Sequence, residues 1–207
     1  SGDTARFIST ALIESRLRTE VWRKALAPLA SMVPAAPAPV LASYVMHRLG
    51  RTVVVRSTTS AGRYTRETST ADSAVPKRRA SFGGYCIAQL VVKGSMMGRF
   101  GQTVVSAGRG DIWCASLDRD ADLQYGDSEH ISLFIPRVTL GEHGERLHGQ
   151  LLPEGQLGCR MLTGHLTRLM GALSRARTDS ARKAASMTPD VLRACLDLAA
   201  GCTGRPG

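Results

Sequence analysis

The chain has 207 residues, of which 43% are hydrophobic and 21% charged, and its formal net charge is +10. This composition is typical of a globular domain and excludes a largely disordered chain. No apolar run reaches the roughly 18 residues needed to span a bilayer, and the five cysteines show no CxxC spacing, so we expect a cytoplasmic protein without a disulfide framework, a structural zinc site or membrane contact.

The first 40 residues are expected to form a helix and a proline-rich connector. Apolar residues recur with the period of an amphipathic helix from Ile13 to Leu29. Prolines follow at positions 34, 37 and 39, and a proline inside a helix removes a backbone hydrogen bond. We therefore predict that the helix ends before Pro34 and that a stiff extended segment leads into the next region.

Residues 41–140 contain short apolar runs separated by turn residues, which predicts a β-sandwich or barrel. The runs are LASYVMHRL, RTVVVRSTTS, RYTRETS, YCIAQLVVKG, GQTVVSAGRG, DIWCASL, ADLQY and HISLFIP. Side chains alternate along a strand, so Val54 and Arg56 are expected on one face, and Val53 and Val55 on the other. The polar stretch 69–84 is typical of a long loop. No long helical pattern interrupts the runs, which argues against a parallel α/β sheet.

The helical period returns after the last predicted strand. A wide apolar face begins at Leu157 and predicts a helix of about 20 residues. We predict that leucines on this face form the interface of a homodimer, namely Leu162, Leu166, Leu169 and Leu173. A second helix is predicted to start with Thr188 as its N-cap and Pro189 at its first position, and to end at Gly201.

The sequence contains no recognised catalytic motif: GxSxG, the Walker A loop and the Rossmann glycine pattern are all missing. The histidines include no HxH pair of the kind that cupin enzymes use to hold a metal. We therefore predict no enzymatic activity, no metal and no cofactor. Asp118, Asp120 and Asp122 alternate, but a polar turn is favoured over a cation site because no liganding glutamate follows at calcium-loop spacing. A metal-dependent cupin enzyme with a site assembled from distant histidines is the first alternative.

The charge is distributed unevenly along the chain. Eleven basic residues lie between Arg48 and Arg109, against Glu67 and Asp72, whereas nine acidic residues lie in 110–155. A solvated arginine-rich surface is the favoured interpretation. A sequence-independent nucleic-acid binder that uses the Arg48–Arg109 region is the second alternative. The basic segment 77–81 is expected to be an exposed loop.

Residues 22–140 resemble the N-terminal sensor domain of AraC/XylS-type bacterial transcription regulators, which is an AraC-binding-like, cupin-type domain. The features that carry the resemblance are, in chain order, Trp22-Arg23, Leu49-Gly50, Arg66-Glu67, Gln102, Gly110-Asp111 and Ile135-Pro136-Arg137. In the family, a strand and a glycine lead to a Gln-containing hairpin, a Gly-Asp turn starts the next strand, and Ile-Pro-Arg closes the barrel.

The resemblance implies an α+β fold: a cupin-like jelly-roll β-barrel with an N-terminal helix and C-terminal dimerisation helices. It also implies a helix-turn-helix region that binds DNA. The chain stops at Gly207, where the family begins that region, so we expect DNA binding only through residues outside this chain. We divide the chain into an N-terminal helix and connector (1–40), a barrel sensor domain (41–140) and a helical dimerisation or linker region (141–207).

A small barrel without a catalytic constellation is suited to enclosing an apolar effector with a few polar anchors. We predict that five strand side chains able to stack or hydrogen-bond contact a small-molecule effector, namely Arg56, Tyr85, Gln89, Trp113 and Phe134. Binding would shift the equilibrium between arrangements of the barrel and the helices. The sequence therefore favours an effector-sensing and dimerisation domain of an AraC-type regulator.

Overall fold

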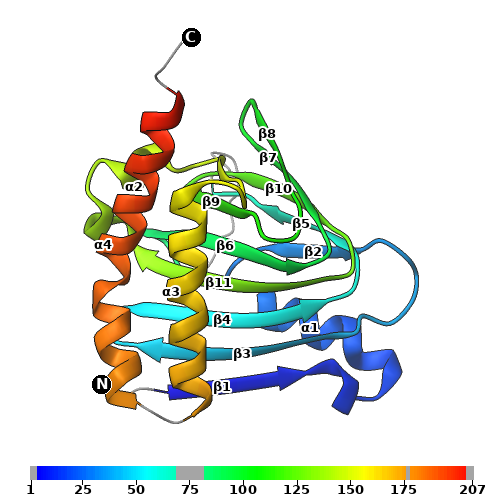
Figure 1. Ribbon diagram of the computed structural model, residues 1–207. Coiled ribbons are helices and arrows are strands. Elements are labelled where there is room, and N and C mark those ends of the chain that lie inside the picture. Colours follow the sequence, from blue (N-terminus) through cyan, green and yellow to red (C-terminus); the bar gives the residue numbers. More distant parts are fainter. Residues whose placement is uncertain (1–3, 69–81, 176–177, 204–207) are drawn as a thin grey trace.

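The computed structural model describes residues 4–68, 82–175 and 178–203. Two antiparallel sheets face each other (Figure 1). The larger sheet has seven strands in the spatial order β1 (Thr4–Ser9), β3 (Ala42–Leu49), β4 (Thr52–Thr59), β11 (Ser128–Pro136), β6 (Tyr85–Lys93), β9 (Ile112–Ser116) and β12 (Gln150–Leu152). The smaller sheet has five strands in the order β2 (Ser31–Pro34), β5 (Gly62–Arg66), β10 (Ala121–Tyr125), β7 (Met96–Phe100) and β8 (Thr103–Ala107).

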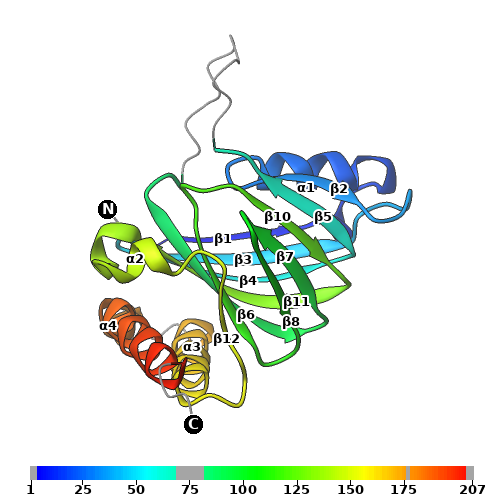
Figure 2. The same ribbon diagram turned by 90° about the horizontal axis from the view of Figure 1, so that it is seen from above.

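Helices cover the shell on two sides (Figure 2). The pair α3 (Leu157–Ser174) and α4 (Thr178–Thr203) packs on the outer face of the seven-stranded sheet. The short helix α1 (Arg18–Leu26) lies on the other side, beside β2. One-turn elements complete the order: η1 (Thr10–Leu12), η2 (Ser15–Leu17), η3 (Arg137–Leu140) and α2 (His143–Arg146). The predicted α+β class and jelly-roll arrangement are confirmed, with two facing sheets in place of a fully closed barrel.

The central strands are buried on both faces, which explains their nearly continuous apolar sequences. In β6, Cys86, Ala88 and Leu90 pack toward α3 and α4. The intervening Ile87 and Val91 pack into the space between the sheets. Because side chains alternate along a strand, one strand contributes to two separate cores. The same alternation confirms the predicted division of β4, where Val54 faces the helices and Val53 faces the interior.

The flanking regions contribute strands as well as helices. β1 pairs with β3 and β2 pairs with β5, so the N-terminal residues extend both sheets. The predicted N-terminal helix is shorter than its apolar pattern suggested, since only Arg18–Leu26 is α-helical. β12 likewise adds a strand from the C-terminal region to β9. Edge pairing of this kind depends on partners far away in sequence, which a local helical period does not reveal.

The leucines predicted as a dimer interface lie inside the chain. Leu162, Leu166 and Leu169 have no exposed surface, and Leu173 is partly buried against the same cluster. The apolar face of α3 is therefore used to cover the sheet and to pack on α4, and Leu162, Leu166 and Leu169 are not available to a second subunit. At Gly158 the two helices approach so closely that a Cβ atom would lie 2.6 Å from the carbonyl oxygen of Cys195.

The start predicted for the second C-terminal helix is wrong. α4 begins ten residues earlier, at Thr178, and contains Pro189 in its interior. The hydroxyl of Thr188 donates to the carbonyl of Ala184 within the same helix at 3.0 Å, so Thr188 does not act as an N-cap. Pro189 has no N–H to donate, but burial of Leu192 and Cys195 against α3 and the sheet holds the helix together across this position.

Candidate ligand-binding cavity

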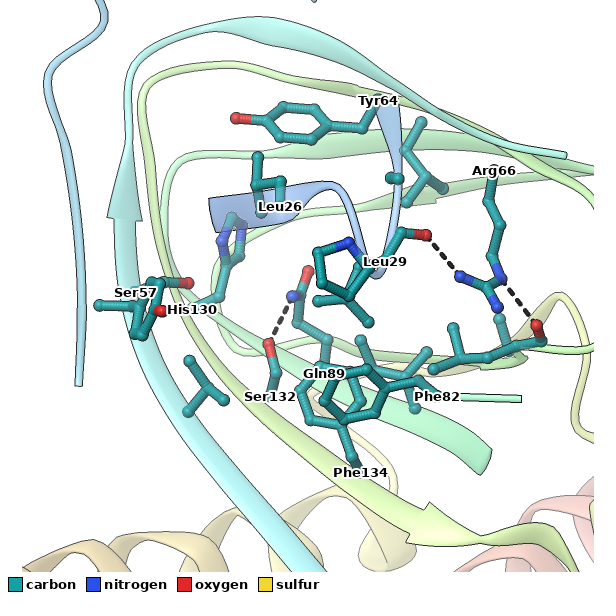
Figure 3. Close-up of a pocket in the computed structure, with 18 of the residues that line it drawn as sticks. Leu26, Leu29, Ser57, Tyr64, Arg66, Phe82, Gln89, His130, Ser132 and Phe134 are labelled. Carbon is teal, nitrogen blue, oxygen red and sulfur yellow. Dashed lines mark hydrogen bonds between the residues drawn. The ribbon is translucent and has the colours of Figure 1, made fainter. Parts of the chain in front are cut away.

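A cavity of about 320 Å³ lies between the two sheets. Its walls come from the inner faces of β3, β4, β6, β9 and β11 on one side, and of β5 and β10 on the other. We call residues 18–30 the lid, because α1 and the turn after it close the remaining side (Figure 3). This volume lies within the usual range of small-molecule sites, roughly 300–1,000 Å³.

The lid is fixed to the neighbouring strand by polar and aromatic contacts. Arg23 Nε donates to the carbonyl of Met32 on β2 at 3.0 Å. Trp22 is only 2% exposed, and its ring lies 6.0 Å from the ring of Tyr44 on β3. Leu26 and Leu29 project into the cavity from above (Figure 3). The lid is thus an integral wall of the cavity.

A hydrogen-bond network on the cavity floor centres on Gln89. Its Nε2 donates to the hydroxyl of Ser132 at 2.6 Å (Figure 3). Its Oε1 accepts from Trp113 Nε1 at 3.1 Å and from the Tyr125 hydroxyl at 2.7 Å. Burial raises the pKa of Tyr125 well above its ordinary value, so this hydroxyl stays protonated and donates. These bonds fix the orientation of the Gln89 amide and the two aromatic rings.

His130 is a buried base at one side of the cavity. It is 2% exposed, and its ring stands edge-on to that of Tyr125 at 4.8 Å between centroids. Among the described residues its Nε2 has no hydrogen-bond partner. Burial lowers the pKa of His130 to about 4, so the ring is neutral at physiological pH. A neutral imidazole nitrogen that is buried without a partner is unfavourable by itself.

Arg66 is a buried cation at another wall of the cavity (Figure 3). Its Nε donates to the carbonyl of Leu117 at 2.7 Å, and its Nη1 donates to the lid carbonyl of Leu29 at 2.5 Å. Burial lowers the pKa of Arg66, and the charges of Asp118 and Asp120 oppose that change. The guanidinium stays charged at neutral pH, because the ordinary arginine pKa exceeds about 12. Arg66 therefore joins the lid to the sheets.

The charged side chains that line the cavity are all positive. They are Arg66, Arg6 on β1 and Arg48 on β3, and no carboxylate from the described residues joins them. Arg6 and Arg48 are exposed, so the cavity reaches the surface on the side of β1 and β3. The interior is otherwise apolar, with aromatic and aliphatic side chains between the polar groups.

The structure brings together three of the five predicted effector-contacting residues. Gln89, Trp113 and Phe134 line the cavity. Tyr85 does not line it directly but packs against Phe82, which does, at 5.7 Å between ring centroids. Whether any of these residues contacts an effector stays a prediction.

Arg56 lies on the opposite face of the sheet from the cavity. Its neighbours Val55 and Ser57 line the cavity, so alternation along β4 directs Arg56 away from it. There Arg56 forms an ion pair with Glu129, with 2.6 Å between Nη2 and Oε1. The prediction used Arg56 as a polar anchor without deciding which face of β4 points into the cavity.

Sequence reasoning missed the two most unusual residues of the cavity, His130 and Arg66. His130 could have been found, because it shares a strand face with Ser132 and the predicted Phe134, at intervals of two residues. Arg66 stood within the family resemblance as part of Arg66-Glu67, but nothing in its local sequence indicates burial. Arginine is rarely fully buried, so an exposed position was the natural expectation.

The metal-dependent alternative requires a cluster of ligating side chains. Within residues 4–68, 82–175 and 178–203, no group of three or more histidine, cysteine, aspartate or glutamate side chains is arranged to hold a metal ion. The three alternating aspartates have other partners: Asp118 pairs with Arg137, Asp120 accepts from Thr68, and Asp122 pairs with Arg63.

The buried thiols are poorly suited to reaction. Cys86, Cys114, Cys159 and Cys195 are all buried. Burial raises the pKa of each thiol, that of Cys86 to about 12. A thiol is reactive as the thiolate, so these side chains act as small apolar groups in the core under α3 and α4.

Part of the basic Arg48–Arg109 region is occupied within the fold. Arg56 pairs with Glu129, Arg63 pairs with Asp122, and Arg66 is inside the cavity wall. The basic segment 77–81 lies outside the described residues.

No helix among the described residues has the length and apolar character that a membrane crossing requires.

No protein-family model matches the sequence, and no curated protein matches it. Among solved structures, the chain is similar to the crystal structure of the AraC-like transcriptional activator CuxR, with a TM-score of 0.79 and 18% identity over 94% of this chain and 70% of that chain. At that identity the likeness shows the fold. The predicted resemblance to AraC-type regulators is thus confirmed at the level of architecture.

Weaker similarities concern about half of the chain. The EutQ protein of Clostridium difficile gives a TM-score of 0.36 at 10% identity, over 54% of this chain and 73% of that chain. The Cupin_2 domain of an XRE family transcriptional regulator from Enterobacter cloacae gives 0.32 at 7% identity, over 52% of this chain and 96% of that chain. Both TM-scores are too low to carry a functional argument.

Proposed function

We propose that this chain is the effector-sensing and dimerisation domain of a cytoplasmic AraC-type transcription regulator, which controls DNA binding by a helix-turn-helix region elsewhere in the regulator. The observation that carries the proposal is the cavity of about 320 Å³ between the sheets. The polar groups of the cavity are held in place by hydrogen bonds. The fold of the chain is similar to that of an AraC-like activator. A preformed apolar cavity with a few oriented polar groups is the usual form of a small-molecule site.

The strands offer a physical route from the cavity to the helices. β4, β6 and β11 present cavity-lining side chains on one face and pack against α3 and α4 on the other. Arg193 of α4 also donates to the carbonyl of Thr139 at 2.8 Å, just beyond the end of β11. A ligand that shifts these strands therefore changes the packing of the helices. If it binds one arrangement of strands and helices more tightly than another, it shifts the population toward that arrangement.

The sensing part of the proposal is tested by ligand-induced stabilisation. Thermal unfolding is measured with sugars, amines, ring-bearing acids and the matching amides. A ligand at one hundred times its Kd stabilises a protein by about 2.7 kcal/mol. Ser57→Phe fills the cavity and should abolish stabilisation, whereas Thr58→Phe places the same ring on the opposite, exposed face and should preserve it. Absence of stabilisation by every class, or equal behaviour of the two variants, would contradict the proposal.

The dimerisation part is tested by sedimentation velocity. Since Leu162, Leu166 and Leu169 are completely buried, we infer that a homodimer uses other side chains, and α3 leaves Leu157 60% and Met161 44% exposed. These residues lie one turn apart on one face. Met161→Glu should convert a dimer to a folded monomer, with Arg160→Glu as the charge-changing control. A monomeric wild-type chain at all concentrations tested would remove dimerisation from the proposal.

A further inference from the structure

The cavity differs between its two ends along the strand direction. His130 and Phe134 are four residues apart on β11, which corresponds to about 13 Å. We call the end near His130 the neutral end, because the polar side chains there, His130, Tyr64 and Tyr125, are uncharged. We call the end near Phe134 the basic end. Arg48 belongs to the basic end, since it pairs with Val53, which in turn pairs with Phe134. Figure 3 shows Arg66 and His130 on opposite sides of the cavity.

At the basic end, Arg66 has unused capacity to bind an anion. A guanidinium has five N–H donors, and the carbonyls of Leu117 and Leu29 accept two of them, which leaves three. Among the described residues no carboxylate lies within ion-pair distance of Arg66. The two acidic side chains that influence it from further away, Asp118 and Asp120, are engaged with Arg137 and Thr68. A buried cation is costly unless it is paired, so an anion is the favoured occupant beside it.

At the neutral end, the buried His130 requires a different partner. Its Nε2 lacks a hydrogen bond among the described residues, and the nearby Tyr125 hydroxyl is already committed to Gln89. The Tyr64 hydroxyl is likewise bonded to Thr59, with 2.6 Å between the oxygens. A hydroxyl group on a ligand is able to donate to an imidazole nitrogen or accept from it, whichever tautomer is present.

Beside Phe134 the cavity wall is apolar and suited to a flat group. Phe82 and Phe134 lie with their ring centroids 5.0 Å apart, and Leu29 lies over them from the lid, whereas Leu26 lies nearer to His130 (Figure 3). Aromatic and aliphatic walls of this kind favour a planar ring over a polyhydroxylated sugar, whose hydroxyls would be buried without partners.

We propose that the cavity binds a small acid with a planar ring, whose carboxylate pairs with Arg66 and whose opposite end carries a hydroxyl that hydrogen-bonds to His130. This inference rests on the proposed sensing function and names the chemical class of its ligand. An amine is disfavoured, because the charged side chains that line the cavity are Arg6, Arg48 and Arg66. Arg66 also donates to the carbonyl of Leu29, so the group proposed to hold the carboxylate is the same group that attaches the lid.

The test compares acids with amides of the same shape by isothermal titration calorimetry. The probe pairs are 4-hydroxycinnamate with 4-hydroxycinnamamide, 4-hydroxyphenylacetate with its amide, and indole-3-acetate with its amide. In the wild-type chain each acid that binds should do so at least about tenfold more tightly than its amide, since a charge-assisted bond to guanidinium is lost with the carboxylate. The ratio should fall to about one in Arg66→Gln and persist in Arg66→Lys, which keeps the charge.

Arg63→Gln is the matched control, because Arg63 lies on the same strand but pairs with Asp122 outside the cavity. It should leave the acid preference unchanged. The hydroxyl contact is tested separately with 4-hydroxycinnamate and cinnamate. His130→Phe keeps a ring of similar size, and it should remove the preference for the hydroxylated acid while retaining the preference for acid over amide.

The possible failures are distinguishable. If neutral amides or amines bind as tightly as the acids in the wild-type chain, the cavity still senses a small molecule, but the assignment of an acid is wrong. If no compound of any class binds, both the acid assignment and the proposed sensing function are overturned. If Arg66→Gln is folded by circular dichroism and retains the full acid preference, Arg66 is not the anion-binding group.

Discussion

The two faces of the seven-stranded sheet differ in chemistry although they belong to the same strands. The outer face carries aliphatic and thiol side chains, such as Val54, Leu133 and Cys114, which are completely buried under α3 and α4. The inner face carries aromatic and polar side chains, such as Trp113 and Gln89, which surround a cavity of about 320 Å³. One face is completely covered by the helices, and the other borders space of the size of a small ligand.

This difference separates stability from ligand recognition. Side chains on the outer face contribute through close packing, so truncating them leaves a void that the surrounding structure fills only partly. Side chains on the inner face already border open space, and their hydrogen bonds orient the groups that a ligand would meet. Variants on the two faces are therefore expected to affect different measurements, and the following predictions test that separation.

The largest effect is expected from the core between α3 and the sheet. Leu166→Ala should lower the free energy of unfolding by about 4 kcal/mol, because Leu166 has no exposed surface and its loss creates a cavity. Met187→Ala on α4, outside the proposed dimer surface, should cost less than about 1 kcal/mol, since Met187 is 60% exposed. Urea unfolding of both variants measures the difference. A Leu166→Ala protein of unchanged stability but altered oligomeric state would instead place this leucine at a subunit interface.

The next effect is a pH dependence that arises from the buried His130. Its pKa is lowered to about 4 in the folded chain, against an ordinary value of 6.5. Above pH 6.5 both states are neutral and the group contributes nothing. As pH falls from 6.5 to 4, the unfolded state binds a proton that the folded state rejects, so about 3 kcal/mol of stability is lost.

His130→Phe should remove this part of the acid sensitivity. Burial also lowers the pKa values of His47, His148 and His165, so the wild-type chain retains some of the slope from these residues. The measurement is therefore the difference between wild-type and variant unfolding free energies at pH 7 and pH 4.5. A constant difference across that range would show that His130 titrates normally in the folded chain.

The strands and their alternation could be predicted from the sequence because both follow from local pattern. The apolar runs became β3, β4, β5, β6, β8, β9, β10 and β11, and the grouping of the β4 side chains onto two faces was correct, although which face points inward was not decided. The apolar period beginning at Leu157 likewise predicted α3. Resemblance to a known family then supplied the jelly-roll arrangement, which local patterns do not determine, whereas the spatial order of the strands was not predicted.

What an apolar surface packs against could not be predicted. The leucine face of α3 suits a dimer interface and a sheet equally well, since both require the same side chains. Which face of β4 points into the cavity depends on the position of the second sheet, and the local sequence does not reveal that position. Arg56 was therefore assigned to the cavity, although it lies on the opposite face. Thr188 and Pro189 have the local signature of a helix start, but tertiary burial of residues before and after them extends α4 through both.

A moderate effect is expected from the network on the cavity floor. Gln89→Leu leaves the hydroxyl of Tyr125 and the Nε1 of Trp113 without their acceptor and should cost about 2 kcal/mol. Gln124→Leu makes the same change at an exposed position on β10 and should be nearly neutral. Thermal unfolding compares the two, and equal midpoints would mean that water replaces the bonds of Gln89.

The smallest predicted difference in the free energy of unfolding is found among three neighbouring valines of β4. Val54→Ala, on the outer face, should cost about 2 kcal/mol, because Val54 is completely buried beneath the helices. Val55→Ala should cost about 1 kcal/mol, because Val55 is only partly buried and already borders the cavity. Val53 faces inward but is completely buried, so Val53→Ala should resemble Val54→Ala. Denaturant unfolding at constant pH resolves the series. If Val53→Ala and Val55→Ala lose equal free energy of unfolding, the space beside Val55 closes in solution. If Val55→Ala loses less, the cavity beside this side chain, and not its inward direction, explains why the truncation is tolerated.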